Sequence, residues 1–365
     1  MFNVLHIMAG ADAGGISMVV LNYYRFMDHT QFHFDIAVTT DQIGQNAEEF
    51  RKLGSEIYRI PLKSHGIRAY ESAISDLLGK KRYDAVHVHE NDTSYVALKT
   101  AKQCGIGCRF AHAHSSLPTA SIKGEIKRIT GAWLNVHYAT KVIGCGKLAG
   151  ERIFGKYGIN SSKGVVLPNA IDTEQYSFEK SVRNQIRTDM NLNGKYVVGM
   201  VGRLSPPKNH DFALNMFRKY HDIAKDTVLL VIGNGEKEEV IKKEIKEYSM
   251  QDYTWMLGRR SDVCKLYQAM DVMIMPSLYE GFPVSAVEAM ATGLPVIMSD
   301  KITKELEFGR AIRYLPISDP LIWADALDEF RNDSDRYLRC VEPKNHNLDI
   351  RQTAKQLEVL YLSKG

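Results

Sequence analysis

The stretch that decides the fold is S-L-Y-E-G-F-P-V-S-A-V-E-A-M-A-T-G-L-P-V-I-M-S-D, at residues 277–300. The apolar run at 272–275 before it predicts a buried strand, which the following proline ends. A helical pattern follows at about 284–292, and Gly293 is placed as its C-terminal cap. A new apolar run at 295–298 predicts the next strand. Strand, helix and strand in this order indicate a parallel β-α-β unit.

Two carboxylates occupy informative positions in this unit. Glu280 lies in the loop after the first strand, and Glu288 lies within the helix. In an open α/β sheet, ligands bind outside the carboxyl ends of the strands. A carboxylate at that edge can accept hydrogen bonds from the hydroxyls of a polyol or sugar. The alternative interpretation is an ordinary strand-loop-helix unit that carries two solvated acids.

Length and composition bound the class of protein. A chain of 365 residues is too long for one ordinary core, which predicts two domains. Apolar and charged contents of 44% and 25% are typical of soluble globular proteins. Apolar runs stay shorter than the ~18 residues of a spanning helix, and the first residues carry no basic leader, so we expect a cytoplasmic protein. The five scattered cysteines favour reduced structural thiols.

The net charge of +4 is too small for a nucleic-acid binder. It is unevenly distributed, because residues 1–170 carry 20 basic and 14 acidic side chains. An excess of this size suits weak attraction to an anionic membrane surface. We therefore expect no nucleic-acid partner and keep a membrane surface as a possible partner.

Strand and helix patterns alternate from the first residue to about residue 170, and the alternation restarts at about residue 196. This pattern predicts two Rossmann-like, doubly wound α/β domains that face each other across a cleft. We place the domains at residues 1–170 and 171–348. A last helical pattern at 349–362 either packs on the second domain or crosses back to the first.

The loop G-A-D-A-G-G at 10–15 follows the first strand and precedes a helix. Paired glycines, Gly14 and Gly15, allow backbone N–H groups to approach an anion at a helix N-terminus. The glycine spacing and the missing acid after the second strand do not match a dinucleotide fingerprint. A tight turn without a ligand is the alternative.

Two cations lie in the loop after the first strand of the second half, which reads G-R-L-S-P-P-K-N-H at 202–210. The guanidinium of Arg203 can bind two phosphate oxygens, and the ammonium of Lys208 adds a mobile charge. Such a pair suits a leaving diphosphate. A solvated pair on the surface is the alternative.

His112 and His114 alternate at the end of a predicted strand in the first half, so both side chains face the same side. Their position favours a functional role as much as burial in the core. A metal site is not expected here, because no third ligand of suitable spacing follows in the nearby sequence.

Residues 121–137 form an amphipathic helical pattern. Ile122, Ile126, Ile129 and Trp133 follow helical spacing, and Lys123, Lys127 and Arg128 lie on adjoining faces. A basic amphipathic helix of this kind can lie on an anionic bilayer, although packing on the core is the commoner role.

Taken in order along the chain, these segments resemble the family-4 glycosyltransferases with the two-domain GT-B fold, most closely the bacterial members that build capsular and exopolysaccharides. The similarity rests on G-G at 14–15, H-A-H-S at 112–115, L-P-N-A-I-D at 167–172, G-R-L-S-P-P-K-N at 202–209, V-I-G-N-G at 231–235, L-G-R-R at 257–260 and E-G-F-P-V-S-A-V-E-A-M-A-T-G-L-P-V-I at 280–297. Each motif is weak alone, and the ordered set is specific.

The resemblance implies a retaining transferase of a nucleotide-diphosphate sugar that needs no metal ion or other cofactor. It implies an acceptor-side first domain, a nucleotide-sugar-binding second domain, and a final helix, about 349–365, that crosses back to the first. The catalytic residues that it implies are His114, Glu280, Arg203 and Lys208. The donor-binding residues that it implies are Gly14, Gly15, Arg203, Lys208, Gly258, Arg259, Glu280, Gly281, Phe282, Val284 and Glu288.

Within this set, the resemblance assigns the diphosphate to Arg203 and Lys208, the ribose to Glu288 and the donor sugar to Glu280. The chain departs from the pattern at Pro283, which has no N–H where many relatives have glycine. It also reads S-D-K-I-T-K-E at 299–305 in place of G-G-x-x-E, so a donor role for Glu305 does not carry over.

The expected reaction transfers a sugar, from UDP-hexose or UDP-N-acetylhexosamine, to a glycan or polyprenyl-linked glycan in cell-surface polysaccharide biosynthesis. The expected site of action is the cytoplasm or the inner face of the plasma membrane. Two alternatives are a sugar-nucleotide epimerase or hydrolase of the same fold and a non-catalytic glycan-binding protein. The donor sugar, the acceptor and the linkage are not defined by the sequence.

Overall fold

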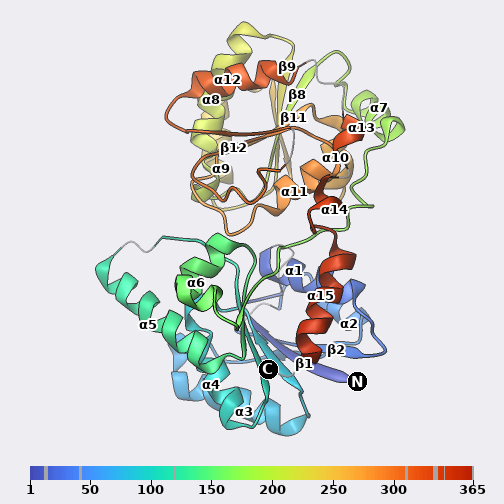
Figure 1. Cartoon of the computed structure of the whole chain (residues 1–365). Helices are drawn as coiled ribbons and strands as arrows, with labels where there is room; N and C mark the ends of the chain where they lie inside the picture. The colour runs from blue at the N-terminus through green and yellow to red at the C-terminus, as the bar shows by residue number, and fades with distance from the viewer. Residues whose placement is uncertain are drawn as a thin grey trace. The chain divides into compact units, whose positions relative to one another are not determined.

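The computed structural model describes residues 1–11, 15–40, 43–118, 121–308, 311–331, 336–340 and 342–363. The chain divides into two compact units (Figure 1). The first comprises Met1–Ala170 and Ile350–Gly365, and the second comprises Ile171–Asp349. Each unit is a parallel β-sheet with helices on its faces, which is the α/β class that the alternating pattern predicts.

The first unit contains a seven-stranded sheet in the order β3-β2-β1-β4-β5-β6-β7, with every described pair parallel. The strand order reverses between β1 and β4, which makes the sheet doubly wound. Its strands are β1 (Phe2–Met8), β2 (Phe32–Val38), β3 (Ile57–Arg59), β4 (Ala85–Val88), β5 (Cys108–Ala113), β6 (Lys141–Gly144) and β7 (Gly164–Val166). Its helices are α1 (Gly15–Phe26), α2 (Ala47–Lys52), α3 (Ile67–Lys80), α4 (Tyr95–Gln103), α5 (Ile122–Tyr138), α6 (Lys147–Ile159) and α15 (Ile350–Leu362).

The last helix of the chain, α15, packs against α1 in the first unit (Figure 1). Its Tyr361 is buried, and the Tyr361 hydroxyl lies 2.7 Å from Nδ1 of His87 on β4. Glu358 accepts a hydrogen bond of 2.8 Å from the backbone N–H of Asp28. The end of the chain is therefore part of the core of the first unit.

The second unit contains a six-stranded parallel sheet in the order β10-β9-β8-β11-β12-β13, so its strand order reverses between β8 and β11. Its central strands are almost wholly apolar because both faces are covered by helices. The strands are β8 (Tyr196–Val201), β9 (Thr227–Ile232), β10 (Thr254–Gly258), β11 (Val272–Met275), β12 (Val296–Ser299) and β13 (Ile312–Leu315). The helices are α7 (Lys180–Asp189), α8 (His210–Ile223), α9 (Glu238–Glu247), α10 (Val263–Ala269), α11 (Val284–Ala291), α12 (Pro320–Glu329), α13 (Arg336–Arg339) and α14 (Glu342–Asn345).

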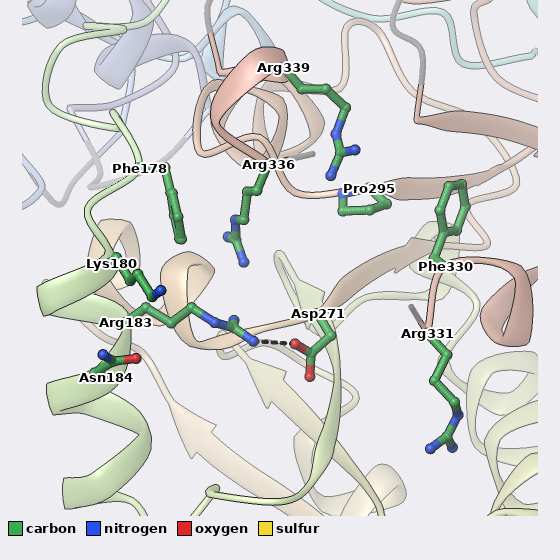
Figure 2. A pocket seen from close by; sticks show the side chains of 10 residues that line it. All are labelled: Phe178, Lys180, Arg183, Asn184, Asp271, Pro295, Phe330, Arg331, Arg336 and Arg339. Carbon is green, nitrogen blue, oxygen red and sulfur yellow. Dashed lines mark hydrogen bonds and ion pairs between the residues drawn. The ribbon is translucent and has the colours of Figure 1, made fainter. Parts of the chain in front are cut away.

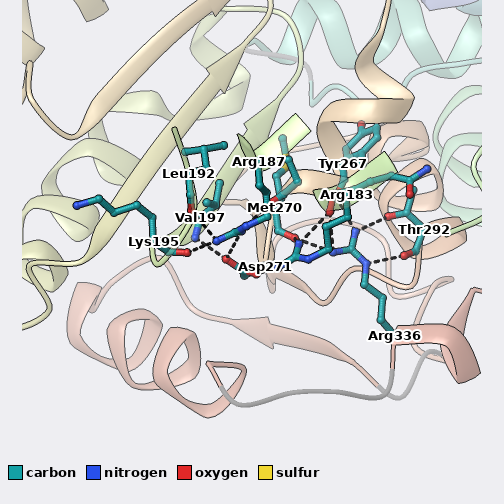
Figure 3. A network of polar contacts seen from close by, with 12 residues as sticks. Arg183, Arg187, Leu192, Lys195, Val197, Tyr267, Met270, Asp271, Thr292 and Arg336 are labelled. Atoms are coloured by element: carbon teal, nitrogen blue, oxygen red, sulfur yellow. Dashed lines mark hydrogen bonds and ion pairs between the residues drawn. The ribbon is translucent and has the colours of Figure 1, made fainter. Parts of the chain in front are cut away.

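An arginine network holds the amino ends of the central strands of this unit (Figure 3). Asp271, just before β11, accepts hydrogen bonds from Arg183, from Arg187 and from the backbone N–H of Val197. Arg336 donates to the carbonyl oxygens of Tyr267 at 2.6 Å, Met270 at 2.7 Å and Thr292 at 2.8 Å. These carbonyls belong to the C-terminal ends of α10 and α11, where helix carbonyls lack intrahelical partners.

We expect Arg336→Met to destabilise the second unit by about 2–4 kcal/mol, because it leaves several buried carbonyl groups without donors. Arg313→Met is the control, since Arg313 forms a half-exposed pair with Glu329 and should contribute less than about 1 kcal/mol. Urea denaturation followed by tryptophan fluorescence measures both variants, and two of the three tryptophans, Trp255 and Trp323, lie in this unit. Equal midpoints for the two variants would contradict this role of Arg336.

Candidate functional site

The site lies in the second unit, where the strand order reverses between β8 and β11. The loops that leave the carboxyl ends of these two strands carry the predicted residues Lys208 and Glu280. Nζ of Lys208 donates to Oε1 of Glu280 at 2.6 Å, and the side chains are only 19% and 13% exposed. Two residues that are 72 positions apart in the sequence are thus brought into one partly buried ion pair.

The backbone of the Lys208 loop is fixed by its neighbours. Pro206–Lys208 forms a short 3-10 turn (η3), and Asn209 ends it in the left-handed conformation, with φ 57°. The backbone N–H of Leu278 donates to the carbonyl of Pro207 at 2.8 Å, and the Asn209 side chain donates to the carbonyl of Pro276 at 3.2 Å. These bonds join the loop after β8 to the loop after β11, so Lys208 and Glu280 are positioned together.

The glycines of V-I-G-N-G allow this loop to lie close to the neighbouring strand end. A Cβ atom on Gly233 would lie 1.9 Å from the carbonyl oxygen of Gly202. A Cβ atom on Gly235 would lie 2.3 Å from the carbonyl oxygen of Leu204. Both glycines have φ values in the region that favours glycine, 139° and 159°. The motif therefore serves close backbone packing beneath the Arg203–Lys208 loop.

Arg203 is separate from the Lys208–Glu280 pair. Its side chain is 75% exposed, and Nε lies 3.3 Å from Oε2 of Glu236, which the sequence analysis did not identify. Arg203 is therefore held by a solvated carboxylate at the rim of the site. An exposed pair of this kind is weakly coupled, so the guanidinium can exchange Glu236 for another anion at little cost.

Glu288 lies on α11 between two tyrosines. Its Oε1 accepts from the hydroxyl of Tyr176 at 3.0 Å, and its Oε2 accepts from the hydroxyl of Tyr267 at 2.8 Å. Burial raises the pKa of the Glu288 carboxyl, and the two hydrogen bonds oppose that shift. Each carboxylate oxygen has a second lone pair, so the group can also accept hydrogen bonds from a ligand. These tyrosines could not be predicted as partners of Glu288, because Tyr176 is 112 residues away and meets it only in the folded unit.

The loop between Glu280 and α11 presents backbone more than side chains. Phe282 is 7% exposed, so its ring is part of the interior of the unit. The N–H of Val284 donates to the carbonyl of Phe282 at 3.0 Å, and Gly281 lies directly after Glu280. Pro283 precedes α11 and has no N–H to offer. In the first turn of α11, the N–H groups of Ala286 and Val287 both donate to the carbonyl of Pro283, at 2.9 and 3.3 Å.

The remaining predicted donor residues lie at two other strand ends. Gly258 ends β10 with φ 62°, its carbonyl accepts from the N–H of Gly233 at 2.9 Å, and Arg259 follows with an exposed side chain. Gly15 begins α1 in the first unit with φ 58°. Gly14 lies outside the described residues.

His114 lies in the first unit, directly after β5, in a group of histidines that the sequence analysis only partly identified. Its Nε2 lies 2.8 Å from Nδ1 of His89, and its backbone N–H donates to the side-chain oxygen of Asn91 at 3.0 Å. Burial lowers the pKa of His114 to about 3, so the ring is neutral at pH 7. His6 and His87 complete the group.

No metal site was expected at His112 and His114 because the nearby sequence offers no third ligand, but the fold brings His89 beside them from β4. Two trios of histidines have ligand atoms within 4.8 Å of one another, namely His6, His87 and His89, and His89, His112 and His114. The signal was present as the alternation V-H-V-H at 86–89, which places His87 and His89 on one face of β4. What the sequence did not show is that β4 lies between β1 and β5.

A cavity of about 250 Å³ in the second unit is not part of this site (Figure 2). Asp271 and Pro295, which line it, precede β11 and β12, so the cavity lies at the amino ends of the strands. Arg183, Arg336 and Arg339 also line it, and their guanidinium groups are engaged with Asp271 or with backbone carbonyls. Lys208 and Glu280 lie at the opposite, carboxyl edge of the same sheet.

Two family models match the chain, Glycosyltransferase Family 4 over residues 13–175 and Glycosyl transferases group 1 over residues 182–309. The chain is 28% identical to the putative glycosyltransferase EpsF of Bacillus subtilis, over 89% of this chain and 86% of that protein. It is 26% identical to the UDP-Gal:alpha-D-GlcNAc-diphosphoundecaprenol alpha-1,3-galactosyltransferase of Escherichia coli, over 81% and 79%.

Solved structures of glycosyltransferases share the fold. Anabaena Alr3699/HepE in complex with UDP and glucose superposes with a TM-score of 0.81, at 18% identity and with full coverage of both chains. WaaG, a glycosyltransferase involved in lipopolysaccharide biosynthesis, gives a TM-score of 0.73 at 14% identity, over 99% of this chain and 100% of that one. The chain belongs to the family-4 type of glycosyltransferases and has the GT-B fold.

We expect the Lys208–Glu280 pair to stabilise the second unit more than the exposed Arg203–Glu236 pair. Lys208→Met removes the cation that contacts the Glu280 carboxylate and should cost about 1–2 kcal/mol, and the double variant with Glu280→Gln should recover much of that loss. The same cycle on Arg203 and Glu236 should give a coupling below about 0.5 kcal/mol. Urea denaturation measures both cycles. Equal coupling energies would show that the buried pair is not formed in solution.

Proposed function

We propose that the protein is a retaining glycosyltransferase that moves a sugar from UDP-hexose or UDP-N-acetylhexosamine to a glycan or polyprenyl-linked glycan. The observation that carries this proposal is the Lys208–Glu280 pair at the carboxyl edge of the second sheet, with Glu288 on the adjoining helix. The relative from Escherichia coli, whose name specifies UDP-Gal and a diphosphoundecaprenol acceptor, supports the donor and acceptor classes. The complexes of Alr3699/HepE with UDP and with UDP-glucose support the nucleotide.

In this proposal the donor diphosphate binds at Lys208 and Arg203. The Lys208 ammonium has three donors, so it can hold Glu280 and a phosphate oxygen at the same time. Arg203 can leave its solvated partner Glu236 and bind two phosphate oxygens. These cations, with backbone N–H groups of Gly15 and of the loop at 281–284, supply positive charge without a metal ion at the diphosphate.

The remaining donor contacts follow from the same arrangement. Glu288, which accepts hydrogen bonds from two tyrosine hydroxyls, also accepts hydrogen bonds from the ribose hydroxyls. The segment from Gly258 to Arg259 lines the base. Glu280, which is positioned by Lys208, accepts hydrogen bonds from the hydroxyls of the donor sugar. His114 in the first unit contacts the sugar near the reacting carbon as a neutral ring.

The proposed reaction is attack by the acceptor hydroxyl on the same face of the sugar from which the diphosphate leaves. The bond between the anomeric carbon and the diphosphate oxygen breaks, and a bond to the acceptor oxygen forms. The acceptor proton passes to the departing phosphate oxygen, so no strong protein base is required. Negative charge develops on the diphosphate as it leaves, and preorganised cations and N–H donors stabilise it.

Incubation with a panel of UDP-sugars, with and without a polyprenyl-diphosphate-linked sugar, tests this function by mass spectrometry. We expect product only when donor and acceptor are both present. Release or epimerisation of the sugar without acceptor, unchanged when acceptor is added, would instead identify a hydrolase or an epimerase. The absence of turnover with every donor and of binding to every donor would leave a non-catalytic glycan-binding protein.

Glu288→Gln should weaken binding of the productive UDP-sugar about tenfold in titration calorimetry, because one acceptor of the ribose hydroxyls is lost. Lys208→Met should weaken it at least as much, since a cation at the diphosphate is removed. Lys225→Met is the matched control, because Lys225 lies in an exposed pair with Asp222 on the surface of the same unit. Unchanged affinity in both site variants would remove the proposed donor site.

We also propose that α5 lies on an anionic membrane surface at the inner face of the plasma membrane. Its four apolar residues at helical spacing are each more than half exposed: Ile122, Ile126, Ile129 and Trp133. The buried residues of α5 are instead Gly131, Ala132 and Asn135. Lys123 and Lys127 are exposed beside them, whereas Arg128 is engaged with Glu125 at 2.7 Å and with the carbonyl of Arg152. None of the described helices is long and apolar enough to cross a bilayer.

Binding to vesicles that contain an anionic phospholipid tests the role of α5. Replacing Ile126 and Trp133 with Ser should reduce co-sedimentation severalfold, because the apolar contact area is lost, and replacing Lys123 and Lys127 with Ser should reduce its salt sensitivity. Ile223→Ser, at an equally exposed isoleucine in the second unit, is the control. Wild-type protein that does not sediment with these vesicles would refute the membrane contact.

A further inference from the structure

Five histidines gather on one face of the first sheet, at neighbouring positions of three adjacent strands. β1 contributes one, β4 and its carboxyl end contribute two, and β5 and its carboxyl end contribute two: His6, His87, His89, His112 and His114. Alternate residues of a strand face the same side, and β4 lies between β1 and β5, so the five rings form one layer. The first four are no more than 2% exposed.

The hydrogen bonds within this layer do not satisfy every ring nitrogen. Nδ1 of His6 lies 3.0 Å from Nε2 of His89, and Nδ1 of His89 lies 2.8 Å from Nε2 of His114. Among the described residues, both ring nitrogens of His112, Nδ1 of His114 and Nε2 of His87 are buried without a hydrogen-bond partner. Buried polar atoms are nearly always paired, so unpaired nitrogens at two adjacent rings require a ligand or a water.

We propose that His89, His112 and His114 bind one divalent transition-metal ion, with Zn²⁺ as the ion that their chemistry suits. Their ligand nitrogens lie within 4.8 Å of one another. Tetrahedral coordination at metal–nitrogen distances of about 2.0–2.1 Å separates ligand nitrogens by roughly 3.4 Å, so closure requires ring movements of about 1 Å. Three neutral imidazoles favour Zn²⁺, Co²⁺, Ni²⁺ or Cu²⁺ over Mg²⁺ and Ca²⁺, which prefer oxygen ligands.

The rest of the layer supports this trio as the ligand set. The hydrogen bond between His89 and His114 already places two imidazole nitrogens on one shared proton, which a metal ion can replace. The proton of His89 then lies on Nε2, which donates to Nδ1 of His6, as metal-bound histidines donate to their outer partners. The trio of His6, His87 and His89 is less suitable, because among the described residues it has one ring nitrogen without a partner, His87 Nε2, whereas His112 and His114 have three.

This site lies in the first unit and shares only His114 with the proposed donor-binding residues, whereas Lys208 and Glu288 lie in the second unit. Metal at the three histidines neither requires nor excludes UDP-sugar binding at Lys208 and Glu288. Failure of one proposal therefore leaves the other intact, since metal binding is measured in the absence of any sugar nucleotide.

The test is titration of the full chain, without a histidine tag and after chelator treatment, with Zn²⁺ by calorimetry and with Co²⁺ by visible absorption. We expect one ion per chain, the ligand-field bands of tetrahedral Co²⁺, and a rise in the midpoint of thermal unfolding with Zn²⁺. His112→Leu should weaken binding at least tenfold and abolish the rise. His65→Ala, at an exposed histidine of the same unit, should change neither.

Two results would overturn the proposal. One is no saturable binding of Zn²⁺ or Co²⁺ by the wild type, in which case the layer is a hydrogen-bonded group of neutral histidines only. The other is equal affinity in the wild type and His112→Leu, which would place the ion elsewhere. If His112→Leu does not fold, His112→Asn retains a polar side chain of smaller size and replaces it in the same comparison.

Discussion

The reversal of strand order between β8 and β11 is the constraint on which the second unit depends. In open α/β sheets, ligands bind outside the carboxyl ends of the strands at the point where the strand order reverses, and the loops after β8 and β11 meet there. Lys208 comes from one loop and Glu280 from the other, and their ion pair connects the two across this point. The backbone bond from Leu278 to Pro207 reinforces the same connection. The strand order thus determines where the site lies, and the loops after β8 and β11 supply its charged side chains.

The charged groups of the site are positioned by neighbouring side chains and can still form hydrogen bonds to a ligand. Lys208 and Glu280 are desolvated together, so neither is an isolated buried charge, and each retains further hydrogen-bonding capacity. Glu288 is held in the same way by neutral hydroxyls instead of a cation. A carboxylate supported by two tyrosines keeps its position without a compensating charge nearby. Such a carboxylate suits hydroxyl recognition, whereas the lysine and arginine suit phosphate.

The fold and much of the site were predictable from local patterns. The alternation of apolar runs and helical spacing predicts two parallel-sheet units, and charged residues directly after strands predict the carboxyl edge. The contacts that depend on strand order were not predictable. Tyr176 and Tyr267 meet Glu288 from distant segments, and His89 meets His114 only because β4 and β5 are neighbours. Side-chain exposure was also not predictable from helical spacing alone. Trp133 is exposed to solvent, whereas Arg128 forms an ion pair with Glu125.

A crystal structure of the protein with UDP would show directly whether the donor binds at the loops after β8 and β11. We expect the diphosphate within hydrogen-bonding distance of Lys208 and Arg203 at the carboxyl edge of the second sheet. We expect the ribose hydroxyls to donate hydrogen bonds to Glu288. UDP in the arginine-lined cavity at the amino edge, with Lys208 and Glu280 unchanged, would contradict these expectations.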